Sequence, residues 1–132
     1  MAIDLLQPPN SDPKTEWEQW RHWFNLLWHF AKDTVLRPET SADAAATITK
    51  NQSYHGVTAL TASRTLTLPA ASDLEDGHII YVQDESGAAG TYNVVIQRAG
   101  SDTVNGGTSV SITSNYGRAV LIKRGSGAWY SA

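Results

Sequence analysis

The sequence predicts a mainly β protein in which an N-terminal amphipathic α-helix precedes a small antiparallel β-sandwich of jelly-roll type. Two observations carry this prediction: a helical pattern before residue 38, and a series of short β-type runs after it. With 132 residues, the chain has room for one compact domain and an appendage. We expect an anchor or assembly helix in residues 1–38, a linker with the first strand in residues 39–50, and the β-sandwich in residues 51–132.

The N-terminal helix is predicted from its two ends. Ser11 and Asp12 precede Pro13, and their side chains can accept hydrogen bonds from the unpaired N–H groups of a first helical turn. Proline is tolerated in that turn, because the N–H that it lacks has no helical partner there. Pro38 ends the helix, since its ring disfavours helical geometry at the preceding residue.

Four of the five tryptophans lie within residues 16–30. At about 100° per residue, the large apolar side chains fill one broad arc of the helix, opposite a mixed-charge face that includes Glu18, Arg21 and Asp33. Three roles remain open for this arc: packing on the chain's own β domain, insertion into a membrane surface, and docking on a partner or on sister helices. The mixed charge disfavours a membrane surface. Strands that alternate with Thr and Ser predict a solvated outer face, which disfavours packing on the β domain.

We therefore expect an assembly or anchor surface, here called the aromatic face. Tryptophan is strongly enriched at binding hot spots, because it buries a large area with few rotatable bonds. The expected members of the aromatic face are Trp17, Trp20, Trp23, Phe24, Leu27, Trp28 and Phe30.

Short β-type runs follow from about residue 46 to the C-terminus, separated by glycine-containing turns. Asn105-Gly106 predicts a tight turn, because both residues tolerate a positive φ. "DESGAAG" stands between two apolar runs, which we expect to pair as a hairpin. The residues expected in the β-domain core or at a subunit interface are Leu66, Leu68, Ile80, Val82, Val94, Ile96, Val110, Ile112, Leu121 and Trp129. A β domain this small, and rich in Thr, Ser, Gly and Ala, buries little surface alone, which favours self-association.

Composition and motifs argue against several classes of function. The net charge of −3 disfavours nonspecific nucleic-acid binding, and the absence of cysteine excludes disulfides and thiolate chemistry. The first residues do not have the pattern of a signal peptide, and no run is apolar enough to span a membrane. His22 and His29 lie two helical turns apart, too far to chelate one ion as an i, i+4 pair does. Without a nucleophile elbow, P-loop, zinc-protease or dinucleotide motif, we expect no enzyme, no catalytic residue, no metal and no cofactor.

The β half also contains a recurring series of phrases. They are "TLTLPA", "G-x-x-I-x-V-x-D-x-S-G-x-A-G", "N-x-x-I", "G-x-D-T-V-N-G", an aromatic-glycine pair and a final Trp after "G-x-G-x", at residues 65–70, 77–90, 93–96, 100–106, 116–117 and 125–129. In these phrases, which cover about half of the chain, it resembles a module of virion proteins of tailed bacteriophages, found in tail fibres, head fibres and capsid decorations. The resemblance implies a small β-sandwich that trimerises, with its N-terminal segment joined to the rest of the virion.

We therefore expect a non-enzymatic structural virion protein, assembled in the cytoplasm of a bacterial host. It is expected to form a homotrimeric short fibre, spike or capsid decoration, attached by the aromatic face to capsid, portal or tail proteins, without nucleic acid or membrane. The alternative is a carbohydrate- or host-surface-binding fibre module that uses exposed Tyr54, Tyr92, Tyr116 or Trp129. For Trp129 a core position is favoured over a sugar platform, because buried aromatic residues dominate small cores.

Overall fold

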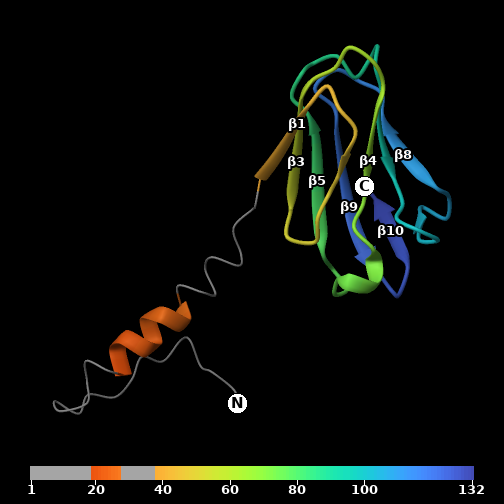
Figure 1. Cartoon of the computed structure of the whole chain (residues 1–132). Helices are drawn as coiled ribbons and strands as arrows, with labels where there is room; N and C mark the ends of the chain where they lie inside the picture. Colours follow the sequence, from red (N-terminus) through yellow and green to blue (C-terminus); the bar gives the residue numbers. More distant parts are fainter. Residues whose placement is uncertain (1–18, 28–37) are drawn as a thin grey trace. The chain divides into compact units, whose positions relative to one another are not determined.

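The computed structural model describes residues 19–27 and 38–132, and the chain divides into two compact units, Met1–Val35 and Leu36–Ala132. In the first unit, residues 19–27 form an α-helix (Figure 1). The predicted helix ends at Pro13 and Pro38 fall beyond this segment, and Trp17, Trp28 and Phe30 lie outside the described residues. We call the second unit the β unit.

The prediction of a mainly β protein is confirmed. Within residues 38–132 the structure contains ten short strands and one turn of 3-10 helix, η1 (Ala71–Asp73) (Figure 1). The strands are β1 (Pro38–Ala42), β2 (Ala46–Thr47), β3 (Tyr54–Ala59), β4 (Arg64–Thr67), β5 (Ile79–Asp84), β6 (Val94–Gln97), β7 (Thr103–Val104), β8 (Ser109–Ile112), β9 (Arg118–Arg124) and β10 (Ala128–Ser131).

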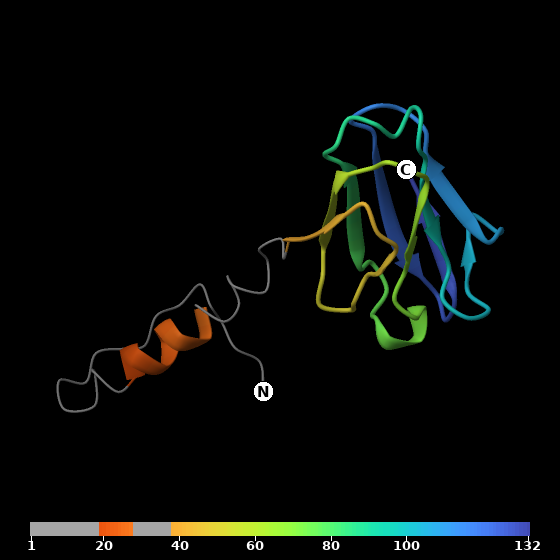
Figure 2. The same ribbon diagram turned by 45° about the horizontal axis from the view of Figure 1, so that its top comes forward.

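The strands form two mixed sheets between which the chain alternates. The six-stranded sheet has the order β1-β3-β5-β9-β10-β7, and the four-stranded sheet has the order β2-β4-β6-β8. From β1 to β9, consecutive strands lie in different sheets, and the colours of Figure 2 allow the reader to follow this. Four pairs of strands that are two apart in sequence therefore lie side by side in parallel: β1 with β3, β3 with β5, β2 with β4, and β4 with β6.

The expectation of an antiparallel arrangement is wrong for most of the described pairings. Antiparallel pairing joins β5 to β9, β9 to β10 and β6 to β8, whereas the other pairs are parallel. The expected hairpin at "DESGAAG" is also wrong, because β5 and β6 lie in different sheets. Residues 85–93 instead cross from one sheet to the other, and such a loop is long enough for the roughly 10 Å between packed sheets.

The segment expected to be a linker contains two strands. Ala46–Thr47 lies where a first strand was expected, but β1 at Pro38–Ala42 was missed. A strand that begins with proline and alternates no apolar residues gives little sequence signal. It is accommodated at the edge of the six-stranded sheet, where one side of its backbone needs no strand partner.

The predicted tight turn at Asn105-Gly106 is confirmed. Both residues have a positive φ, 51° and 77°, and the turn is closed by hydrogen bonds between Val104 and Gly107. This turn leads from β7 in one sheet to β8 in the other, so it changes sheets and does not form a hairpin of neighbouring strands.

Side chains from both sheets contribute to one hydrophobic core. Nine of the ten residues expected in the core or at an interface are buried in it, and Val110 is partly buried against it. The nine are Leu66, Leu68, Ile80, Val82, Val94, Ile96, Ile112, Leu121 and Trp129. Ile48 and Val57 also lie in this core with no exposed surface, although neither was singled out from the sequence.

The outward-facing side chains of the two sheets differ in character. On the four-stranded sheet they include Thr65, Thr67 and Gln97, so the expectation of a solvated outer face holds there. On the six-stranded sheet that expectation is wrong, because Ile79 and Tyr130 are exposed by 37% and 51%. The runs "HIIYVQD" and "AVLIKR" place apolar residues at successive positions, so one set enters the core and the other faces outward.

Candidate functional site

Four connections lie at one end of the two sheets, which we call the loop end (top of Figure 1). They are residues 43–45, 60–63, 85–93 and 113–117. The parallel strands β1, β3 and β5 all end there, and β9, which runs antiparallel to β5, begins there. Segments far apart in sequence therefore meet at the loop end.

Asp84 organises two of these connections. Its side chain is fully buried at the end of β5. The carboxylate accepts hydrogen bonds of 3.0–3.1 Å from the N–H groups of Ser86, Gly87, Ala89 and Tyr116, and another from the hydroxyl of Ser86. Burial raises the pKa of Asp84, but these hydrogen bonds together outweigh burial, and the pKa lies below its ordinary value.

This geometry is that of an ionised carboxylate that joins two connections, which we call a staple, and not that of a catalytic base. A carboxylate has about four lone-pair positions, and the five donors around Asp84 occupy them. The sequence contains a local signal for part of this network, because an aspartate followed by Ser and Gly in "DESG" is typical of a turn whose N–H groups bond to the aspartate. The long-range donor at Tyr116 was not visible, because it comes from a connection 32 residues away in sequence.

Tyr116 is the most exposed large aromatic residue that the structure describes in the β unit, at 68%. Its φ of 57° is unusual for a residue other than glycine. A Cβ on Gly87 would collide with the Tyr116 ring, so the ring lies directly against this glycine. The neighbouring Asn115 accepts a hydrogen bond of 2.9 Å from Gly90 N–H, which further joins the two connections. The ring is thus presented outward from a braced backbone.

The four aromatic residues of the carbohydrate alternative are in different environments. Tyr92 and Tyr116 lie in the loop end and are exposed, whereas Trp129 has no exposed surface and is not available as a platform. Tyr54 is partly buried, and its hydroxyl donates a hydrogen bond to Glu85. That hydrogen bond, together with burial, raises the pKa of Tyr54.

Asp43 makes a second staple at the loop end. Its carboxylate accepts hydrogen bonds from the N–H of Thr61 at 2.8 Å, from the Thr61 hydroxyl, and from Nε of Arg64 at 3.0 Å. These partners, first Thr61 and then Arg64, lower the pKa of Asp43 to about 2. The β1–β2 connection is thereby tied to the β3–β4 connection.

His55 is a buried polar residue that sequence reasoning left unassigned. Its Nε2 lies 3.0 Å from the Ser41 hydroxyl, and its Nδ1 lies 3.3 Å from Oε1 of Gln52. A hydroxyl, an imidazole and an orienting group in this order occur in nucleophilic catalysis. Here, however, the imidazole is 3% exposed, and burial lowers the pKa of His55. We interpret the contacts as hydrogen bonds that satisfy a buried ring on β3, next to the edge strand β1.

Three of the four described members of the aromatic face form one cluster. The ring centroids of Trp20, Trp23 and Phe24 are 5.5, 5.7 and 5.0 Å apart in the pairs Trp20–Trp23, Trp20–Phe24 and Trp23–Phe24. Phe24 is 54% exposed, while Leu27 is partly buried. The helix therefore brings the three predicted aromatic residues Trp20, Trp23 and Phe24 together.

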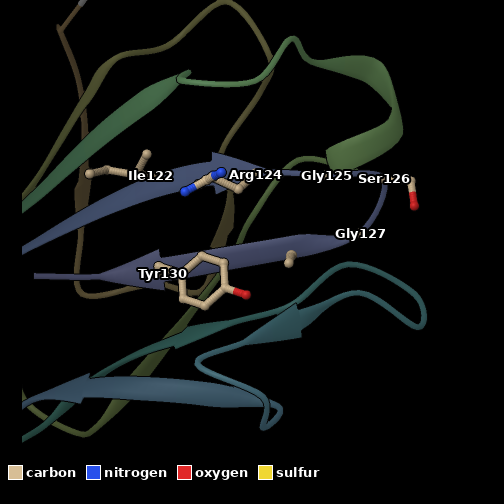
Figure 3. Close-up of a pocket in the computed structure, with 7 residues that line it drawn as sticks. Ile122, Arg124, Gly125, Ser126, Gly127 and Tyr130 are labelled. Carbon is tan, nitrogen blue, oxygen red and sulfur yellow. The ribbon is translucent and has the colours of Figure 1, made fainter.

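A shallow groove lies on the outer side of the β9–β10 hairpin. Figure 3 shows Arg124 and Tyr130 on neighbouring strands of this hairpin, with the turn at residues 125–127 beside them. The groove is lined by Ile122, Arg124, Gly125, Ser126, Gly127, Ala128 and Tyr130. It opens on the apolar outer face of the six-stranded sheet, a surface that was not expected from the sequence.

Among residues 19–27 and 38–132, no group of three or more His, Cys, Asp or Glu side chains is placed to hold a metal ion. In the same described ranges, no helix has the length and apolar character needed to cross a membrane.

A scan against protein-family models found no match, and no curated protein matches the sequence.

Proposed function

We propose that this chain is a structural virion protein of a tailed bacteriophage. In this proposal it forms a homotrimeric short fibre, spike or capsid decoration, assembled in the host cytoplasm and carried on the virion. The β unit is a β-sandwich that projects, and the aromatic face of the N-terminal helix attaches it to a capsid, portal or tail protein. The resemblance of the β half to phage virion modules supports this role.

The observation that carries the proposal is the cluster of Trp20, Trp23 and Phe24 in a unit separate from the β unit. Three large rings on one side of a helix, one of them 54% exposed, provide the rigid apolar area typical of binding hot spots. A chain with an aromatic attachment element and a separate β unit has the organisation that a decoration or short fibre needs.

Deleting residues 1–37 is expected to abolish incorporation of the protein into virions, because the attachment surface is removed. The deletion stops before Pro38, so that β1 stays intact. The measurement is the copy number of the protein in purified virions, after complementation of a phage that lacks the gene. In the full chain, Phe24→Asp is expected to reduce this copy number at least tenfold. His22→Asp is the matched control on the polar face and is expected to leave the copy number unchanged.

Normal incorporation of the truncated protein would show that attachment resides elsewhere in the chain. Equal losses for Phe24→Asp and His22→Asp would show that the helix matters for its folding and not for its aromatic face. Either result contradicts the proposed attachment.

A second candidate function, binding of a host-surface glycan, is favoured by the exposure and bracing of Tyr116. Aromatic faces held in a fixed orientation stack on sugar rings without losing further side-chain freedom. Tyr116→Asn removes the ring and keeps a residue that tolerates the positive φ, so it is expected to weaken glycan-array binding about tenfold. Tyr116→Phe should retain binding, and Gln97→Ala, on the four-stranded sheet, is the surface control. If all three variants bind like the native protein, or if the native protein binds no glycan, this second function is wrong.

A further inference from the structure

The outer face of the six-stranded sheet carries two apolar rows that run across its strands. Cross-strand register aligns residues of β5, β9 and β10 in one row and residues of β3, β5 and β9 in the other. The first row is Ile79, Ile122 and Tyr130, and the second row is Tyr54, Tyr81 and Val120. All six residues keep some exposed surface, with Tyr130 at 51% and Ile79 at 37%. Contiguous exposed apolar surface rich in tyrosine and isoleucine is typical of an interaction site.

A third row, next to the second, is charged, with an acid over β3 and a base on β9. The carboxylate of Glu85 lies over Gly56 of β3, because a Cβ on that glycine would collide with it. Gly56 is in register with Gln83 of β5, which is in register with Arg118 of β9. The Nε of Arg118 donates a hydrogen bond of 2.9 Å to Oε1 of Gln83. The acid and the base therefore lie at one level of the sheet, on opposite sides of β5.

The acid and the base of the third row do not form an ion pair within one copy. The backbones of Gly56 and Arg118 are two strand spacings apart, or about 10 Å, and the Arg118 side chain reaches the Gln83 side chain between them. No ion pair joins Glu85 to Arg118 in the described part of the chain. Each side chain is exposed and oppositely charged to the other, and each is held by a neighbour within its own copy, because Glu85 accepts a hydrogen bond from the Tyr54 hydroxyl and Arg118 donates one to Gln83. Such a surface is complementary to a copy of itself that is shifted sideways, with its strands running in the same direction.

We propose that the outer face of the six-stranded sheet is the interface between copies of this chain. In this arrangement the copies surround an axis parallel to the strands, and Glu85 of each copy faces Arg118 of the next. Because all copies have the same strand direction, the apolar rows meet at the same level and exclude water together. The contact is head-to-tail, so a closed ring follows when the rotation between neighbours closes. The proposal rests on the homotrimer of the proposed function, and it names the surface that makes that homotrimer.

The absence of cysteine makes a direct test of this interface possible in the full chain. Glu85→Cys and Arg118→Cys chains are coexpressed and treated with a short bismaleimide. We expect covalent dimers that join position 85 of one chain to position 118 of another, identified by mass spectrometry. Neither variant alone should give this product. Thr65→Cys coexpressed with Gln97→Cys is the matched control on the four-stranded sheet and should give no dimer.

Charge reversal gives an independent measurement by sedimentation. Glu85→Arg and Arg118→Glu are each expected to weaken association at least tenfold, and the double variant is expected to recover it. A native trimer that gives no 85–118 product and is unaffected by charge reversal overturns this interface but leaves the homotrimer in place. A native monomer overturns both, whereas attachment to the virion is tested separately by the N-terminal deletion.

Discussion

Replacing Asp84 with alanine is expected to lower the free energy of unfolding of the β unit by about 3 kcal/mol or more. The carboxylate is buried and accepts hydrogen bonds from four backbone N–H groups and one hydroxyl. Each buried donor left without an acceptor costs about 1–3 kcal/mol, and water will reach some but not all of them. The loss also separates the β5–β6 connection from Tyr116, so the loop end loses its bracing. Urea unfolding followed by far-UV circular dichroism, at fixed protein concentration, measures the change.

Two variants make this expectation specific. Asp84→Asn keeps the shape and one acceptor oxygen but directs an amide group at backbone donors, so an intermediate loss is expected. Asp43→Ala removes the other staple of the loop end, whose side chain is only partly buried and whose partners can hydrogen-bond to water. A smaller loss is expected there. If Asp84→Ala is no more destabilising than Asp43→Ala, the buried network does not stabilise the loop end as argued.

The pH dependence of stability should also reflect the ionised carboxylate of Asp84. The pKa of Asp84 in the folded protein lies below its ordinary value of 3.8, so the unfolded chain binds the proton more tightly. The stability that this carboxylate contributes is therefore fully present above about pH 4 and is lost as the pH falls through the folded pKa. In Asp84→Asn, which cannot ionise at this position, the fall of the urea midpoint below pH 4 should be less steep than in the native protein. An unchanged slope would contradict the assignment of an ionised Asp84.

Strand positions could be predicted from the sequence, but strand partners could not. Alternation placed Leu66, Leu68 and Ile112 on inward-facing sides, and they are buried. Alternation is a property of one strand, whereas pairing depends on where the chain goes next. "DESGAAG" is compatible with a hairpin and with a crossing between sheets. It crosses because β3 and β9 already occupy both sides of β5, so β6 cannot pair with β5.

The sequence contains a sign of the apolar outer face of the six-stranded sheet, but that sign also allowed a different interpretation. "HIIYVQD" does not alternate, and a continuous apolar run indicates a strand whose two faces are both covered. Ile80 and Val82 face the core, while Ile79 and Tyr81 face outward. The alternation of apolar residues with Thr and Ser in β4 and β8 was taken to hold for both sheets, although these two strands belong to the four-stranded sheet. The charged row could not be predicted, because it depends on the register of β3, β5 and β9.

Replacing Trp129 with alanine is expected to destabilise the β unit by about 3–5 kcal/mol, the range for removing a large aromatic side chain from a packed core. Trp129 has no exposed surface, and its strand lies between β9 and β7 in the six-stranded sheet. Small domains have a total stability of about 5–15 kcal/mol, so this loss removes a large share of it. A lower urea midpoint with an unchanged slope of the transition would report lost stability.

Replacing Trp129 with phenylalanine distinguishes the effect of side-chain volume on stability from the effect of the polar indole nitrogen. The indole Nε1 is buried and has no hydrogen-bond partner among the described residues, so its N–H contributes no bond that phenylalanine would lose. Trp129→Phe should therefore cost less than half as much as Trp129→Ala, because it leaves a smaller cavity and removes an unpaired donor. Tyr92→Ala, at an exposed aromatic residue of the loop end, should change stability by no more than about 0.5 kcal/mol. If Trp129→Ala unfolds at the same urea concentration as the native protein, the ring is not a core residue, and a surface role for it must be considered again.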